Sequence, residues 1–210
     1  MNHRQVSFIT LEGIEGAGKS THLLFIRDLL INRGRAVITT REPGGTALGE
    51  KLRDILLQKD NASISAEAEL LMMFAARQQH LTEVILPALD AGKIVVCDRF
   101  SDSSYAYQCG GRGIDDAKFD QLKHWVHPDL VPDMTLLFDL PAEEGLRRAR
   151  SAGEMDRFES ETLGFFQAAR EAYLGLADKE PDRFHVLDAG NSIADIQSEI
   201  TRLFEEEGLV

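Results

Sequence analysis

The chain has 210 residues, of which 43% are hydrophobic and 28% charged, the proportions of an ordinary globular protein. Its net charge of −12 argues against a nucleic-acid polymer as partner, because phosphate backbones select basic surfaces. A small phosphorylated ligand needs only a local basic pocket and stays open. Cys97 and Cys109 form neither a disulfide framework nor a metal-binding pattern. We see no signal peptide and no membrane-spanning run, so we expect a cytoplasmic protein without a membrane partner.

Five short apolar runs predict β-strands, and helical patterns lie between them. Strands that alternate with helices imply right-handed crossovers and a parallel sheet with helices on both faces. No repeat and no domain-scale linker interrupts this pattern. We therefore predict one α/β domain over residues 1–210 with a five-stranded parallel sheet. Its strands are expected at residues 6–11, 36–40, 93–97, 134–140 and 183–187.

The segment 13–20 reads GIEGAGKS and fits the phosphate-binding P-loop pattern G-x-x-x-x-G-K-[ST]. It follows the first predicted strand and precedes residues 21–31, whose apolar side chains share one helical face. Backbone N–H groups of such a loop converge on phosphate oxygens, and the helix N-terminus adds partial positive charge. We expect Lys19 to reach the β- and γ-phosphates of ATP and Ser20 to hold Mg²⁺. A glycine-rich turn with a chance lysine is the alternative, which the flanking strand and helix disfavour. The residues expected to bind ATP are Gly13, Ile14, Glu15, Gly16, Ala17, Gly18, Lys19, Ser20 and Thr21.

The segment 40–46, TREPGGT, follows the second predicted strand. Its Pro-Gly-Gly sequence forces a turn at the carboxyl edge of the sheet, where ligands of open α/β sheets bind. Arg41 and Glu42 are therefore expected near the P-loop. From this segment alone, a turn that carries a surface ion pair is an equally good interpretation.

Residues 66–90 show a long helical pattern that Pro87 is expected to kink or end. Arg77 falls inside its apolar stripe, four residues after Met73. An unpaired buried guanidinium costs roughly several kcal/mol, so Arg77 needs a partner. Two interpretations stay open here. Arg77 either pairs with a core carboxylate or reaches solvent, or it contacts a ligand that lies against Met73 or Phe74.

The third predicted strand leads into Asp98, at the edge where a P-loop enzyme places its Mg²⁺-side carboxylate. Arg99 follows directly. Hydroxyl and amide side chains come next, and this combination suits recognition of the polar edge of a ring. They are Ser103, Ser104, Tyr105, Tyr107 and Gln108.

An arginine-rich segment at about residues 147–160 contains Arg150 and Arg157, which flank small and polar residues. Arginines on a segment that moves near a P-loop indicate a lid that neutralises phosphoryl charge. A solvated basic segment is the alternative, because surface charges are common.

Taken together, these motifs resemble the bacterial thymidylate kinase family over about residues 6–200. The P-loop alone is generic, whereas R-E-P-G-G-T and D-R-F-x-x-S-S-x-A-Y-Q are specific. The resemblance implies a P-loop nucleoside monophosphate kinase fold and transfer of phosphate from ATP to dTMP with Mg²⁺. It also implies a homodimer. Another kinase of the same fold with a different monophosphate, and a nucleotide-driven switch, are the competing hypotheses.

The resemblance also implies roles for individual residues. It assigns catalysis to Lys19, Glu15, Arg99, Arg150 and Arg157, and the metal to Ser20 and Asp98. The family usually has a phenylalanine stacked on thymine where this chain has Met73, with Phe74 next to it. The implied substrate-binding residues are Arg41, Glu42, Arg53, Met73, Phe74, Arg77, Arg99, Ser104, Tyr107 and Gln108.

Overall fold

The structure is a computed structural model that describes residues 6–59, 64–152 and 156–210. Its centre is a sheet of five parallel strands in the order β2-β3-β1-β4-β5, which confirms the predicted fold class. Four of the five strands end one residue beyond their predicted ends, so that Arg41 and Asp98 are the last residues of β2 and β3. The strands are β1 (Phe8–Glu12), β2 (Val37–Arg41), β3 (Ile94–Asp98), β4 (Met134–Asp139) and β5 (Phe184–Asp188).

The strand order places the P-loop at the middle of the sheet. β1 lies between β3 and β4, and the chain builds β2 and β3 on one side of it before crossing to β4 and β5 on the other. The point where a parallel sheet changes direction leaves a crevice at the carboxyl ends of its strands. The loop that leaves β1 therefore opens into this crevice.

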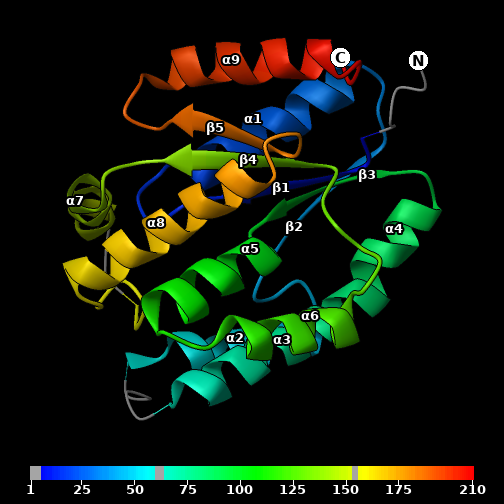
Figure 1. Cartoon of the computed structure of the whole chain (residues 1–210). Coiled ribbons are helices and arrows are strands. Elements are labelled where there is room, and N and C mark those ends of the chain that lie inside the picture. Colours follow the sequence, from blue (N-terminus) through cyan, green and yellow to red (C-terminus); the bar gives the residue numbers. More distant parts are fainter. Residues whose placement is uncertain (1–5, 60–63, 153–155) are drawn as a thin grey trace.

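Helices α1 (Lys19–Asn32) and α9 (Ile193–Glu206) cover one face of the sheet, the upper one in Figure 1. Ile26 and Leu30 of α1, together with Ile200 and Phe204 of α9, are buried against the strands in one hydrophobic cluster. Burial of the apolar side chains of these two helices against the sheet stabilises this face.

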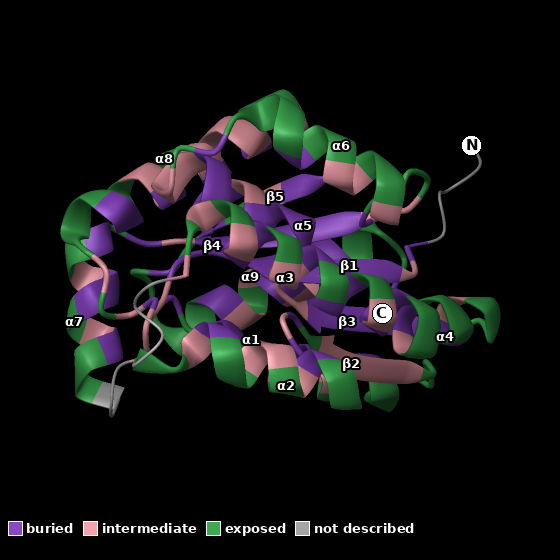
Figure 2. Cartoon of the chain, turned by 90° about the horizontal axis from the view of Figure 1, so that it is seen from below, coloured by how far each residue is buried: buried purple, intermediate pink, exposed green. Residues whose placement is uncertain are grey.

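The opposite face carries the elements that surround the crevice. Helix α8 (Leu163–Lys179) packs there beside α5 (Ser101–Ser104) and the π-helix η3 (Tyr105–Gly111). Farther from the sheet lie α2 (Ala47–Leu57), α3 (Ala66–His80) and α6 (Asp116–Val126), as Figure 1 shows. Figure 2 shows that the strands are mostly buried, whereas the helices around them expose their outer sides.

The long helix predicted at residues 66–90 is interrupted. It consists of α3, a π-helical turn η2 (Leu81–Ile85) and α4 (Leu86–Asp90). Leu86 donates its N–H to Leu81, a wider turn than in an α-helix. The prediction placed the interruption at Pro87, but the structure widens the helix in the turn before it. A π-turn accommodates the hydrogen bond that a proline cannot donate.

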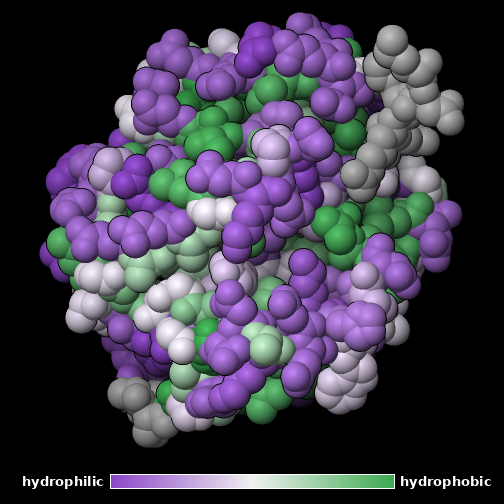
Figure 3. Space-filling model, in the orientation of Figure 1, coloured by the Kyte–Doolittle hydropathy of each residue, from purple (hydrophilic) through white to green (hydrophobic). Residues whose placement is uncertain are grey.

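Helix α7 (Ala142–Ala152) lies at the end of the molecule that is nearest the P-loop in Figure 1. None of the helices within the described ranges is both long and apolar enough to cross a membrane. Figure 3 shows hydrophilic side chains over most of one face of the molecule, with hydrophobic residues in small groups.

Candidate active site

A cavity of about 280 Å³ opens at the carboxyl edge of the sheet, and residues from most of the predicted motifs line it. It takes its walls from the P-loop, the turns after β2 and β3, α2, α3, η3 and the segment after α7. The lining residues are Glu15, Gly16, Lys19, Ser20, Glu42, Pro43, Arg53, Leu57, Met73, Arg77, Asp98, Arg99, Phe100, Ser103, Ser104, Tyr107, Gln108, Asp156, Phe158 and Glu159.

Two glycines of the P-loop have no space for a side chain. A Cβ atom on Gly13 would lie 2.4 Å from the carbonyl oxygen of Phe138, and one on Gly16 would lie 2.3 Å from that of Gly145. Both residues also have positive φ angles, 132° and 74°, which side chains disfavour. The loop is therefore held close to β4 and α7, with its backbone bent toward the crevice.

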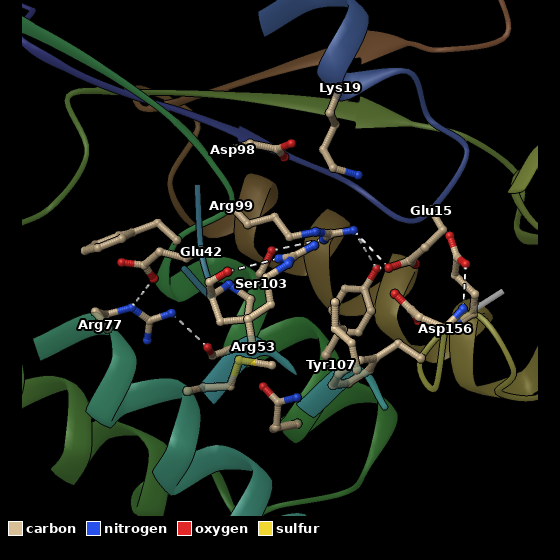
Figure 4. Close-up of a pocket in the computed structure, with 18 of the residues that line it drawn as sticks. Glu15, Lys19, Glu42, Arg53, Arg77, Asp98, Arg99, Ser103, Tyr107 and Asp156 are labelled. Atoms are coloured by element: carbon tan, nitrogen blue, oxygen red, sulfur yellow. Dashed lines mark hydrogen bonds and ion pairs between the residues drawn. The ribbon is translucent and has the colours of Figure 1, made fainter. Parts of the chain in front are cut away.

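Lys19 is buried and donates from Nζ to the carbonyl oxygens of Gly13 and Ile14, both at 2.9 Å. Burial and, as the next largest cause, the positive charge of Arg99 lower the pKa of Lys19 to about 8, although the nearby carboxylates of Asp98, Glu15 and Glu12 act to raise it. An anionic ligand at the loop would favour the charged ammonium. Figure 4 shows that Lys19 and Asp98 lie on the sheet side of the cavity.

Arg99 is held by four side chains. Its Nη1 donates to Ser103 at 3.1 Å and to Tyr173 at 3.2 Å, and its Nη2 donates to Glu15 at 3.0 Å and to Tyr107 at 3.1 Å. Its backbone has a φ angle of 72°, a strained value for a residue other than glycine. Such fixation presents the guanidinium in one direction, beside the P-loop carboxylate of Glu15 (Figure 4).

Arg77 lies under the opposite end of the cavity, in a buried chain of polar groups. Its Nε donates to Glu42 Oε2 at 2.7 Å, and Glu42 Oε1 lies 3.0 Å from Nδ1 of His80. Burial alone would raise the pKa of Glu42, but Arg77 and His80 outweigh burial and hold that pKa below its ordinary value. Thr40 lies 2.6 Å from the other ring nitrogen of His80. Glu42, in the turn after β2, thereby holds the side chain of Arg77 on α3 in place.

Three lining residues each have one buried polar atom without a hydrogen-bond partner among the described residues. They are Nη1 of Arg77, Oε1 of Gln108 and Oδ1 of Asp98. Arg77 otherwise donates from Nη2 to Ser104 at 2.9 Å, and Gln108 donates from Nε2 to Glu69 at 2.9 Å. Buried polar atoms are normally paired. One donor and two acceptors are thus left for a ligand or an ion.

Asp98 and Ser20 fit the site expected for Mg²⁺. Both line the cavity, Ser20 directly after Lys19 and Asp98 at the end of β3, and Oδ1 of Asp98 is buried without a hydrogen-bond partner among the described residues. The described residues contain no group of three or more metal-ligating side chains. Mg²⁺ bound at phosphates uses one or two protein ligands and several waters.

The cavity brings together most of the predicted substrate-binding residues, but Arg41 and Phe74 do not line it, and neither do the lid arginines Arg150 and Arg157. Arg41 is exposed and pairs with Glu50 at 2.8 Å. Phe74 packs in the core, where the guanidinium carbon of Arg77 lies 4.7 Å from the centre of the Phe74 ring. Met73 lines the cavity. Arg150 is exposed on α7.

The arginine-rich segment is described in part, since residues 153–155 of the expected lid lie outside the described ranges. Arg157 does not line the cavity in this structure. It donates from Nη2 to Glu69 at 2.5 Å and from Nε to the carbonyl oxygen of Leu56 at 2.7 Å. It therefore connects the segment after α7 to α2 and α3.

Several lining residues carried no prediction. Asp156 and Glu159 cap each other's backbone N–H at 2.9 Å, and Phe158 lines the cavity beside them. Their D-x-x-E spacing resembles a capping box and was a usable signal for an ordered turn. Tyr173 contacts Arg99 from α8, 74 residues away in the chain, and no sequence signal marks it.

Comparison with known proteins gives one consistent family. A family profile described as thymidylate kinase matches residues 11–200. The thymidylate kinase of Thiobacillus denitrificans is 55% identical over 199 residues, which cover 95% of this chain and 96% of that protein. The thymidylate kinase of Ectopseudomonas mendocina is 52% identical over 196 residues, 93% of each chain. The crystal structure of thymidylate kinase from Ehrlichia chaffeensis superimposes with a TM-score of 0.76 at 33% identity, covering 96% of this chain and 99% of that one.

Proposed function

The chain belongs to the thymidylate kinase family, and from that premise we propose that it transfers a phosphoryl group from ATP to dTMP, giving dTDP and ADP. The observation that carries the choice of base is the pair of unpartnered atoms in the cavity, a donor on Arg77 and an acceptor on Gln108. Thymine presents a carbonyl acceptor at C4 beside an N–H donor at N3. The two protein atoms are the complement of that edge.

A flat ring has an apolar surface to lie on in this cavity. Met73, Phe100 and Phe158 line the same cavity as Arg77 and Gln108. The thioether of Met73 is polarisable and packs well against aromatic faces.

The phosphate end of the cavity fits the reaction itself. The acceptor of the phosphoryl group is already an ionised phosphate, so catalysis requires positioning of two anions and screening of their repulsion. Arg99 and Arg53 line the side of the acceptor, and Lys19 lies at the P-loop on the side of ATP. Mg²⁺ held by Ser20 and Asp98 would neutralise charge on the transferred phosphoryl group.

Glu15 has a separate role in this proposal. It accepts hydrogen bonds from Arg99 and Tyr107 and lies at the edge of the cavity. A carboxylate at that position orients Arg99 and can accept from a sugar hydroxyl. No proton needs to be removed from the phosphate acceptor, so we assign Glu15 no general-base step.

Arg150 and Arg157 remain predicted lid arginines that supply charge when both nucleotides are bound. A homodimer and a cytoplasmic location also remain predictions from the resemblance to thymidylate kinases. Arg150 is exposed, whereas Arg157 is bound to Glu69 in this structure.

Steady-state turnover with ATP and dTMP, dUMP, dCMP or dGMP tests the proposal. We expect dTMP to have the highest kcat/KM and dGMP to be a negligible substrate. Hydrolysis of ATP without an acceptor should be slow. A preference for another monophosphate would establish the competing kinase, and rapid hydrolysis without any acceptor would establish the nucleotide switch.

A further inference from the structure

Glu69 is a buried carboxylate on α3 that phosphoryl transfer does not use and that does not line the cavity. Its Oε1 accepts from Gln108 Nε2 at 2.9 Å and from Arg112 Nε at 3.2 Å. Its Oε2 accepts from Arg112 Nη2 at 3.2 Å and from Arg157 Nη2 at 2.5 Å. One carboxylate therefore joins α3, η3 and the segment after α7.

This contact decides which end of the Gln108 amide faces the cavity. An amide has a donor end and an acceptor end of almost the same shape, and only its hydrogen bonds distinguish them. A carboxylate can only accept, so Gln108 must turn its NH₂ group toward Glu69. Its carbonyl oxygen is then left buried and unpartnered in a residue that lines the cavity.

We propose that Glu69 is a positioning residue for base selection, because it fixes the amide of Gln108 with its carbonyl oxygen toward the base. This inference rests on the proposed function. The fixed acceptor can bind the N3–H of thymine or uracil. Cytosine presents a lone pair at N3, which a carbonyl oxygen repels. Glu69 therefore sets the preference for imide bases although it touches no substrate.

The surroundings keep Glu69 from turning away. Arg112 is also bound to Glu161 at 2.6 Å and lies 4.7 Å from the ring centre of Phe165. Arg157 is also bound to the carbonyl oxygen of Leu56 and lies over the ring of Phe158. Both guanidinium groups are thus fixed from their far sides, and Glu69 is fixed between them.

Replacement of Glu69 by glutamine makes a specific prediction. Two arginine N–H groups meet Oε2, whereas one arginine N–H and the Gln108 amide meet Oε1. The single oxygen of the new amide is best placed toward the two arginine groups. Its NH₂ group then faces Gln108, which must turn over and present its own NH₂ group to the base.

The experiment compares kcat/KM for dTMP, dUMP and dCMP in the wild type, in Glu69→Gln and in Glu67→Gln. Glu67 is the matched control, an exposed carboxylate on the same helix that pairs with Lys118. In Glu69→Gln we expect the dTMP-to-dCMP ratio to fall by about tenfold or more, the loss of one well-placed hydrogen bond. The dTMP-to-dUMP ratio should stay unchanged, because both bases carry N3–H. Glu67→Gln should leave both ratios unchanged.

These ratios separate base selection from a loss of folded protein. Both substrates are measured in one preparation, so the fraction of active enzyme cancels. If Glu69→Gln does not yield folded protein, Glu69→Asp takes its place, since it keeps the charge and withdraws the oxygen from Gln108. An unchanged dTMP-to-dCMP ratio in the folded variant overturns the inference, and so does an equal change in the dTMP-to-dUMP ratio. Failure of the wild type to phosphorylate dTMP would instead overturn the proposed function.

Discussion

Arg77 confirms one of the two interpretations that its sequence position allowed, the core ion pair, and the ligand contact stays a prediction. It forms the core ion pair with Glu42, and it still has Nη1 unpartnered at the cavity. Its guanidinium lies between the rings of Phe74 and Phe100, 4.7 and 5.1 Å from their centres. The ion pair and the rings hold the cation, and its Nη1 has no partner among the described residues.

Arg77→Ala should therefore have two separate effects. We expect kcat/KM for dTMP to fall by about ten- to a hundredfold, because the base carbonyl loses its donor, while the KM for ATP stays unchanged. We also expect the free energy of unfolding to fall by roughly 3 kcal/mol or more, because Glu42 keeps only His80 as a buried partner. Steady-state kinetics and urea unfolding measure the two effects. Arg202→Ala removes an exposed ion pair as a control. If stability falls and the dTMP kinetics do not, Arg77 is only a core ion-pair residue.

Glu12 is a second buried carboxylate beside the site, at the end of β1. Its Oε1 accepts from the N–H of Phe100 at 2.7 Å. Its Oε2, the Ser103 hydroxyl and the Tyr173 hydroxyl form a triangle with sides of 2.6, 2.7 and 2.9 Å. Ser103 and Tyr173 both donate to Oε2 of Glu12. Burial is the largest cause, and the negative charge of Asp102 the next, of a pKa of Glu12 that is raised to about 7.

The sign of the pH dependence follows from that raised pKa. Between about pH 4.5 and 7 the folded state holds a proton on Glu12 that the unfolded state has released, so stability falls as the pH rises and is constant above that range. Glu12→Gln removes this dependence. We expect its free energy of unfolding, relative to the wild type, to increase by up to about 3 kcal/mol from pH 4.5 to pH 8. Urea titrations at several pH values would contradict this if the two pH profiles stayed parallel.

At the scale of single elements, the P-loop depends on glycine for two reasons, and a matched pair of variants separates them. Gly13 has a positive φ angle and lies against the carbonyl oxygen of Phe138. Gly34 has a positive φ angle of 77° but nothing within 4 Å of an added Cβ. Gly13→Ala should thus lose roughly 3 kcal/mol or more of unfolding free energy, and Gly34→Ala only about 1–2 kcal/mol. Equal losses, measured by urea unfolding, would show that the contact with β4 is unimportant.

Helix α7 offers a test of the expected lid. Arg150 and Arg147 are both exposed on it, but Arg147 pairs with Glu144 at 2.7 Å. If Arg150 neutralises phosphoryl charge, Arg150→Ala should lower kcat by about tenfold, because the charge matters most in the transition state. Arg147→Ala should have no such effect. Calorimetry should show unchanged dTMP affinity in both variants. Equal turnover of the two variants would identify Arg150 as a solvated surface charge.

The strands and the P-loop were predictable because their signals are local. Runs of Val, Ile and Leu predict β1 and β3 to within two residues, and the P-loop pattern fixes the turn after β1. The π-turn at 81–85 was not predicted, because a helical period alone does not show at which turn the hydrogen bonding of the helix changes to accommodate Pro87. The sequence predicts Phe74 as well as Met73 at the ligand, because the helical pattern does not show which of two adjacent apolar residues faces the cavity and which faces the core.

The network around Glu69 was not predictable for a different reason. Its partners Gln108, Arg112 and Arg157 are 39, 43 and 88 residues away, and they meet it only because α3, η3 and the segment after α7 pack together. In the sequence, Glu69 had only a favourable position in the first turn of a helix. Long-range polar contacts of this kind require the tertiary fold.

At the scale of the whole molecule, an acidic protein has to bind two anionic nucleotides. In the cavity, Arg77 is neutralised by Glu42 and Arg99 by Glu15, so that Lys19 and Arg53 are the lining cations without a carboxylate partner at salt-bridge distance in the described ranges. A cavity with two such cations favours a ligand that carries a single phosphate and a base. A long phosphate backbone finds no continuous basic surface in a chain of net charge −12.

Ligand-linked melting tests this distinction without relying on turnover. A ligand that binds only the folded state stabilises it by about 2.7 kcal/mol at a hundred times its Kd. For a chain of this size that corresponds to a rise in Tm of roughly 5–10 °C. We expect dTMP to produce such a shift and dCMP a much smaller one at equal concentration, because the donor of Arg77 and the acceptor of Gln108 match only the imide edge. A thymine oligonucleotide of ten or so residues carries the same bases on a polyanion and should produce no shift. A shift with the oligonucleotide as large as with dTMP would mean that the cavity, or a surface around it, accepts a polymer.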